Sequence, residues 1–202
     1  MQISADFVHA RMPFSDDELP PETFDSHLVV SITAPDDPSG PRPRLGIIPV
    51  LDKTGSMSHD NKLTTAKAAI SHLCGFLTDG DTMGLVAFDL DAQVVVDPSD
   101  YSPSRIASAL SPIRPGGSTN LAAGLEAGLE LARHLAAEWQ AEGVPFEIRV
   151  IVATDGLANV GLTRPDDIAE LTADLPKGVR VSTVGVGYDC DHGLLTRLAQ
   201  PS

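Results

Sequence analysis

Basic residues, cysteines and long apolar runs are all scarce in this chain, and each scarcity excludes a class of protein. The 202 residues include 14 Lys and Arg against 28 Asp and Glu, which gives a formal net charge of −14 at pH 7. This charge argues against nucleic acid and anionic membrane surfaces as partners, because both are themselves negative. No uncharged apolar run is long enough for a transmembrane helix, so we expect no membrane span.

The two cysteines, Cys74 and Cys190, are too few to form a disulfide framework in a domain of this size. Cys74 falls in an amphipathic helical pattern and is expected to be a small buried residue, whereas Cys190 follows a predicted strand and is expected to be more exposed. Residues 1–25 lack the basic start and apolar core of a secretion signal, which predicts a cytoplasmic protein. A secreted or membrane-tethered full-length form stays open.

The composition changes near residue 43. Residues 2–9 and 26–33 have strand character, and the stretch from Pro35 to Pro43 is rich in Pro, Asp, Ser and Gly, which is typical of a linker. We therefore predict a β-strand appendage with a Pro-rich linker at residues 1–43 and a main domain at residues 44–202.

From Leu45 onward, segments with strand and helix patterns alternate, which predicts an α/β fold whose mostly parallel sheet is covered on both faces. The strand at 92–97 follows a turn at 89–91 and is expected to be an antiparallel edge strand. The other strands are predicted at 45–52, 82–88, 146–154 and 179–187. The helices are predicted from Asp60 to Gly80, after Pro103, from Leu121 through Trp139, from Pro165 through Leu171, and at 194–199.

The apolar run that begins at Leu45 ends in three side chains that carry oxygen, namely Asp52, Thr54 and Ser56. A run that is apolar on both faces predicts a buried central strand, and residues just beyond such a strand line the crevice where open α/β sheets bind ligands. Pro49 lies inside this strand and cannot donate a ladder hydrogen bond, so we expect a bulge or a locally unpaired carbonyl there.

Two further loops carry oxygen ligands. Thr119 stands at a predicted helix start after Gly116 and Gly117, and Asp155 directly follows a predicted strand. Hydroxyl and carboxylate oxygens suit Mg²⁺, Mn²⁺ or Ca²⁺ and suit zinc poorly. With only two acidic residues facing the metal, one coordination position would stay open for a carboxylate from a partner protein.

The three clusters together resemble a known metal site. Asp52-x-Thr54-x-Ser56, Thr119 within Gly-Gly-Ser-Thr-Asn-Leu, and Asp155 within Ala-Thr-Asp-Gly-Leu-Ala-Asn-Val-Gly match, in order and spacing, the metal-ion-dependent adhesion site of von Willebrand factor type A domains. The resemblance covers roughly residues 44 to 200, and the Gly-Ser-Met after the first aspartate is similar to the bacterial and chloride-channel-accessory-like branch.

This resemblance implies a Rossmann-like three-layer sandwich with a divalent metal at the C-terminal edge of its sheet. In the family, hydroxyls such as those of Thr54, Ser56 and Thr119 bind the metal directly, and one or both aspartates, here Asp52 and Asp155, act through water. The family also has a final strand after the last helix, and we expect residues 44–202 to lack it.

Two departures from the family pattern lie in the first loop. Thr54 stands where the family usually has serine, so the hydroxyl is kept with an added methyl group. Lys53 is a cation beside the site, and strand alternation predicts that it points away from the metal. The residues expected to form a rim that contacts the partner are Ser118, Asn120, His59 and Gly156, although His59 also fits a solvated helix start.

The function implied by the resemblance is a non-enzymatic protein-binding domain that engages an acidic residue of its partner through the cation. Two alternatives stay open. Asp52-Lys53-Thr54-Gly55-Ser56 also resembles the phosphorylated aspartate motif of haloacid-dehalogenase-like enzymes, although a second aspartate two residues after Asp52 is absent. The third possibility is a type A scaffold whose metal site is vestigial.

Overall fold

The computed structural model describes residues 2–8, 27–33, 42–155, 158–187 and 190–199. The chain divides into two compact units, Met1–Arg42 and Pro43–Ser202, and each contains its own β-sheet. In the first unit, β1 (Gln2–Val8) pairs antiparallel with β2 (His27–Thr33), with Gln2 opposite Thr33 and Val8 opposite His27. Both strands lie within one residue of the positions predicted from the sequence.

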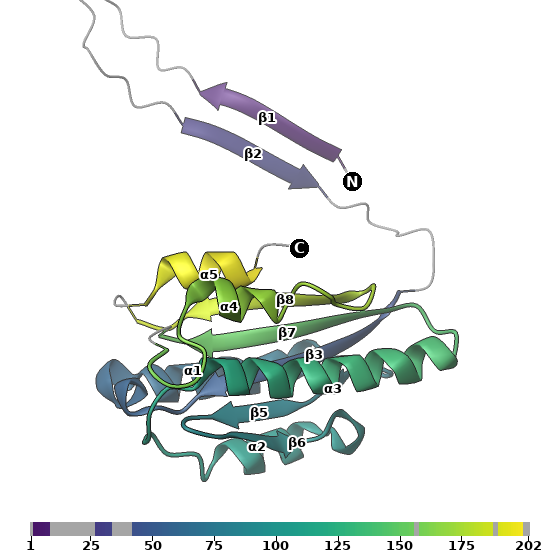
Figure 1. The fold of residues 1–202 in the computed structure, drawn as a ribbon. Coiled ribbons are helices and arrows are strands. Elements are labelled where there is room, and N and C mark those ends of the chain that lie inside the picture. The colour runs from purple at the N-terminus through teal and green to yellow at the C-terminus, as the bar shows by residue number, and fades with distance from the viewer. Residues whose placement is uncertain (1, 9–26, 34–41, 156–157, 188–189, 200–202) are drawn as a thin grey trace, which may run out of the picture. The chain divides into compact units, whose positions relative to one another are not determined.

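The second unit is built around one mixed sheet with the strand order β6-β5-β3-β7-β8, and β4 also pairs with β3 (Figure 1). The pairs β3–β4, β3–β5, β3–β7 and β7–β8 are parallel, and only β5–β6 is antiparallel. The strands are β3 (Arg44–Asp52), β4 (Thr82–Met83), β5 (Leu85–Phe88), β6 (Ala92–Val96), β7 (Phe146–Thr154) and β8 (Val179–Gly185). The predicted α/β class, with a mostly parallel sheet and one antiparallel edge strand, is confirmed.

Helices cover both faces of this sheet because the central strand β3 is apolar and buried on both sides. Side chains of α3, α4 and α5 belong to the same hydrophobic cluster as Ile48 and Val50 of β3, whereas those of α1 and α2 belong to the cluster of Ile47 and Leu51. Figure 1 shows the long helix α3 crossing one face of the sheet. The helices are α1 (Lys62–Leu73), α2 (Pro103–Leu110), α3 (Leu121–Ala141), α4 (Pro165–Glu170) and α5 (His192–Ala199), with short 3₁₀ segments η1 (Gly55–Asn61), η2 (Cys74–Phe76) and η3 (Pro98–Asp100).

Pro49 interrupts one side of the central strand without a bulge. The register between β3 and β7 runs unbroken from Arg44 to Leu51, and Pro49 lies opposite Ile151. On the other side, pairing with β4 ends at Ile47 and pairing with β5 resumes at Val50 with the same offset. Pro49, which has no N–H to donate, therefore lies where β3 pairs with neither β4 nor β5. The single strand predicted at 82–88 is accordingly two strands, β4 and β5.

Three local predictions were wrong. Asp60 does not cap α1: it lies in η1 with a positive φ of 50°, and the N-cap is Asn61, which makes no side-chain cap hydrogen bond. The helix does not run to Gly80, because α1 ends at Leu73 and η2 follows. Cys190 is buried rather than exposed, and its sulfur lies 2.7 Å from where a β-carbon on Gly185 would be.

No helix within the described residues combines the length and the apolar character that crossing a membrane requires.

Candidate metal centre

The first loop of the site begins where β3 ends. Asp52 is the last residue of the strand and is fully buried, and its Oδ1 accepts a hydrogen bond of 2.8 Å from the backbone N–H of Thr54. The hydroxyl oxygens of Thr54 and Ser56 lie 3.1 Å apart and share a hydrogen bond. This local turn brings the three side chains predicted from the D-x-T-x-S spacing into one group.

The second loop reaches the first through backbone hydrogen bonds. The N–H of Gly55 donates to the carbonyl of Gly117 over 3.2 Å, and the N–H of Gly116 donates to the carbonyl of Lys53 over 2.8 Å. Gly117 adopts a φ of +73°, which a side chain would strain, and this turn delivers the buried Thr119 to the start of α3. The turn geometry therefore requires glycine at position 117, whereas a β-carbon on Gly116 would meet no atom within 4 Å.

The third loop joins both others. The hydroxyl of Thr154, the last residue of β7, donates a hydrogen bond of 2.6 Å to Oδ2 of Asp52. Beyond Asp155, Asn159 accepts a hydrogen bond of 2.8 Å from the N–H of Thr119 and returns one of 3.0 Å to the Thr119 carbonyl. The three loops thus form a closed set of contacts at the carboxyl ends of β3 and β7.

The two buried carboxylates influence each other. Burial raises the pKa of Asp52 above its ordinary value, the hydrogen bonds from Thr154 and Thr54 oppose that rise, and the charge of Asp155 adds to it. Asp155 is also fully buried, and its Oδ1 has no hydrogen-bond partner among the described residues. A buried carboxylate oxygen without a partner is costly, so this atom indicates a position that a cation can fill.

Lys62 is a site residue that the sequence analysis missed. Its ammonium lies 3.4 Å from Oδ2 of Asp155, and both side chains are almost completely buried. Lys62 is the first residue of α1 and lies 93 positions before Asp155 in the sequence. No local spacing rule therefore relates the two residues. Lys53, by contrast, points to Asp89, and its ammonium pairs with that carboxylate.

The residues expected to form the rim occupy different environments. Ser118 and His59 are exposed, and the His59 Nδ1 lies 3.3 Å from the carbonyl of Ser56. Asn120 is the N-cap of α3, and its side chain accepts a hydrogen bond from the N–H of Ala123 and donates one to the carbonyl of Leu90. Gly156 lies outside the described residues.

The donor set fits a hard divalent cation. It consists of two carboxylates and three hydroxyls, from Asp52, Asp155, Thr54, Ser56 and Thr119, together with the unpartnered Oδ1 of Asp155. No group of three or more His, Cys, Asp or Glu residues with metal-binding geometry occurs in the described part of the chain. A site of this kind would therefore depend on hydroxyl oxygens as much as on charge.

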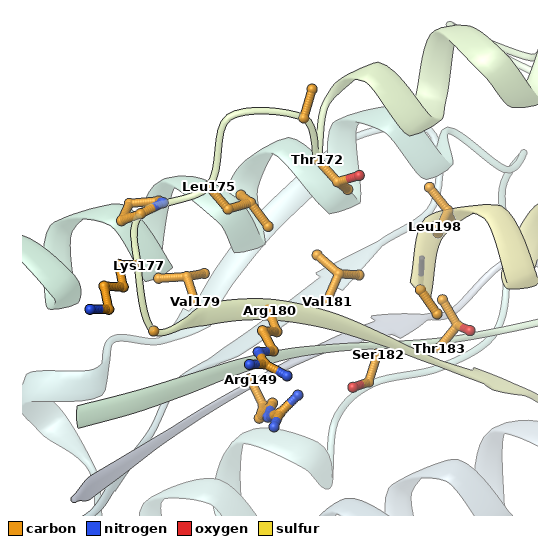
Figure 2. Close-up of a pocket in the computed structure, with 14 residues that line it drawn as sticks. Arg149, Thr172, Leu175, Lys177, Val179, Arg180, Val181, Ser182, Thr183 and Leu198 are labelled. Carbon is orange, nitrogen blue, oxygen red and sulfur yellow. The ribbon is translucent and has the colours of Figure 1, made fainter. Parts of the chain in front are cut away.

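A pocket of about 680 Å³ lies elsewhere on the same unit (Figure 2). It is lined mainly by residues between Thr172 and Thr183, together with Arg149 and Leu198. Figure 2 shows Val179 and Val181 on one side of β8 and Arg180 on the other. None of the candidate metal ligands lines this pocket, so pocket size does not identify the site here.

Comparison with solved structures supports the fold. A von Willebrand factor type A protein from Catenulispora acidiphila matches with a TM-score of 0.61 and 20% identity, covering 86% of this chain and 38% of that one. Manganese-loaded TRAP protein of Plasmodium vivax matches with a TM-score of 0.61 and 20% identity, covering 77% and 62%. The mussel byssus protein PTMP1 with a zinc-occupied MIDAS motif matches with a TM-score of 0.59 and 22% identity, covering 79% and 41%.

The sequence comparisons place the chain in a family. The uncharacterized protein YfbK of Escherichia coli is 30% identical over 175 residues, which cover 85% of this chain and 29% of that protein. The chain thus spans less than a third of this relative's length. The family model for the von Willebrand factor type A domain matches residues 47–157, more than half of the chain. With the three loops meeting at the carboxyl edge of a mostly parallel sheet, the chain belongs to the von Willebrand factor type A domain family.

Proposed function

We propose that this domain binds a divalent metal ion at a metal-ion-dependent adhesion site and, through that ion, an acidic side chain of a partner protein. Mg²⁺ is the proposed ion, with Mn²⁺ or Ca²⁺ as alternatives. The observation that carries the proposal is the unpartnered, fully buried Oδ1 of Asp155 beside the buried Asp52. Two similar solved structures, the manganese-loaded TRAP protein and PTMP1 with a zinc-occupied MIDAS motif, support it.

Each residue has a distinct role in this proposal. The hydroxyls of Thr54, Ser56 and Thr119 ligate the metal directly, and Asp52 and Asp155 act in the inner or the second shell. The remaining position holds water until the partner's carboxylate replaces it. A bound cation would also add positive charge at this edge of a chain whose net charge is −14, and an acidic side chain of a partner needs such a charge.

A phosphoryl-transfer function through Asp52 is less well supported. A nucleophilic aspartate must present a free oxygen to its substrate, yet Asp52 is fully buried and both of its oxygens accept hydrogen bonds, from Thr54 and Thr154. We therefore propose a non-enzymatic binding domain. The bacterial and chloride-channel-accessory-like branch, the division at residue 43 and a cytoplasmic location remain part of the same proposal.

Titration calorimetry with Mg²⁺ and with Mn²⁺ tests the metal site. We expect the wild type to bind and Thr119→Ala or Asp52→Ala to bind about a hundredfold more weakly or not at all, since each loses a ligand or its nearest support. Thr183→Ala is the matched control for Thr119→Ala. Thr183 lies in β8, and its hydroxyl donates to the carbonyl of Leu195 in α5. A wild type that binds neither metal at millimolar concentration would favour the vestigial scaffold.

Partner binding is tested separately. Capture of partner proteins should require the metal and should be lost in EDTA or with Asp52→Ala. Capture that EDTA leaves unchanged would refute the carboxylate–metal contact, whatever the calorimetry shows.

A further inference from the structure

The buried ion pair between Lys62 and Asp155 places a positive charge at the candidate metal site. The ammonium lies 3.4 Å from Oδ2 of Asp155, and the side chains of Lys62 and Asp155 are only 4% and 0% exposed. Because both partners are removed from water, their interaction is screened far less than that of a surface pair. The ammonium therefore acts on the same carboxylate that a divalent cation would use.

The position of Lys62 is fixed by the packing of the helix that it begins. Leu63, Ala66 and Ile70 of α1 are buried in the cluster on one face of the sheet. The preceding segment, η1, carries Ser56, which is itself a candidate ligand. Lys62 thus directly follows the segment that carries Ser56 and begins a helix that packs on the sheet.

Lys62 satisfies this carboxylate only in part. Oδ2 of Asp155 meets the ammonium, whereas Oδ1 has no hydrogen-bond partner among the described residues. Among the described residues, the charged groups named here are two carboxylates, those of Asp52 and Asp155, and one ammonium, that of Lys62. When both carboxylates are ionised, one net negative charge remains.

We propose that Lys62 is an internal counter-cation, which holds Asp155 in the metal-free domain and competes with the divalent ion for it. The inference rests on the proposed function, because it presumes that the ion binds at Asp155. A divalent ion and an ammonium on one carboxylate repel each other, so the lysine weakens metal binding. Together with a bound divalent ion, these three groups carry a net positive charge, which an incoming carboxylate neutralises.

The first test measures the metal alone by calorimetry on Lys62→Met. We expect Mg²⁺ and Mn²⁺ to bind this variant roughly 5- to 150-fold more tightly than the wild type, the usual range of coupling between two sites. Lys67→Met is the matched control: it also removes one positive charge from α1, but the Lys67 ammonium donates to the carbonyl of Ile113. Lys62→Arg keeps the charge and is expected to retain an affinity near that of the wild type.

The second test measures thermal unfolding in EDTA and in Mg²⁺. Without metal, Lys62→Met leaves two buried carboxylates without their cation, so its melting temperature should fall below those of the wild type and Lys67→Met. Mg²⁺ should raise the melting temperature of Lys62→Met by more than it raises that of the wild type or of Lys67→Met. If Lys62→Met does not fold even with Mg²⁺, Lys62→Gln keeps a hydrogen-bond donor without the charge and replaces it in both tests.

The outcomes separate the two proposals. A wild type that binds metal, with an uncharged Lys62 variant that binds no more tightly, overturns the role of Lys62 and leaves the proposed function intact. Tight binding by the variant and none by the wild type supports the competition but refutes metal binding by the natural domain. No binding by either protein overturns both.

Discussion

Thr154 controls the orientation of the first aspartate. Its hydroxyl donates the 2.6 Å hydrogen bond to Oδ2 of Asp52, while the N–H of Thr54 holds Oδ1. Both residues of the Thr154–Asp52 pair are fully buried, so neither group has water as a substitute partner. This contact fixes the carboxylate from two sides and also ties the end of β7 to the end of β3.

We predict that Thr154→Val weakens Mg²⁺ and Mn²⁺ binding by about tenfold or more, because the hydrogen bond that orients Asp52 is lost. Valine keeps the shape but leaves Oδ2 without this hydrogen bond, so the free energy of unfolding should fall by about 1–3 kcal/mol. Calorimetry and urea unfolding measure the two effects. Thr183→Val removes a strand hydroxyl that serves a backbone carbonyl, and its metal affinity should stay at the wild-type value; equal losses in both variants would contradict the prediction.

The sequence motifs predict which loops meet, but they do not predict every residue that shapes the site. Asp52, Thr54 and Ser56 are grouped by a local turn, so their spacing is informative. Lys62 reaches Asp155 only because α1 packs on the sheet, and such a contact between residues 93 positions apart has no local signature. Thr154 is a polar residue at the end of a strand whose immediately preceding residues are apolar. This was the available sequence signal that Thr154 contacts the site.

At the level of elements, α3 lies unusually close to the sheet that it covers. A β-carbon on Gly128 would come within 2.4 Å of Val50 Cγ2 and 3.3 Å of Val150 Cγ1. One on Gly124 would come within 2.5 Å of the Phe88 ring. These two glycines permit the close approach of the helix, and the N-terminal end of the same helix follows Thr119 and its cap Asn120.

We predict that Gly128→Ala lowers the free energy of unfolding by about 1–3 kcal/mol through overpacking. This loss exceeds the gain of up to about 1 kcal/mol that alanine brings to a helix interior. Urea unfolding followed by circular dichroism measures the change. Gly75→Ala is the control, since no atom lies within 4 Å of its β-carbon position, and it should be at least as stable as the wild type. A Gly128→Ala variant as stable as the wild type would show that the helix can shift outward without cost.

The elements themselves were largely predictable, because apolar periodicity sets their type. The strand at Phe146–Thr154 and the long helix from Leu121 have the predicted positions. The start of α1 was not predicted, because Asp60 and Asn61 both adopt positive φ values and form a kinked 3₁₀ segment. Capping preferences assume an extended residue before the helix, and that condition does not hold here.

For the whole molecule, alternation of strands and helices was sufficient to predict the α/β class, and the short turn at 89–91 predicted the antiparallel edge strand. The burial of Cys190 was not, because it depends on contacts between Gly185, Cys190 and Leu195 that only the packing of α5 on β8 creates. The two hydrophobic clusters consist of residues between Leu45 and Leu198, and all candidate metal ligands fall in the same range. The unit Pro43–Ser202 therefore contains the cores and the site together.

We predict that a protein of residues 43–202 alone unfolds cooperatively, with a melting temperature and Mg²⁺ affinity close to those of the full chain. The reason is that both described cores and every candidate ligand belong to this unit. Thermal unfolding and calorimetry on the two proteins make the comparison. The complementary piece, residues 1–42, contributes a two-stranded sheet to the described structure. Because an isolated hairpin is marginally stable in water, circular dichroism should show this piece to be unfolded when it is alone. If the shortened protein aggregates or loses its metal affinity, the first unit is part of the folded domain and the division at residue 43 is wrong.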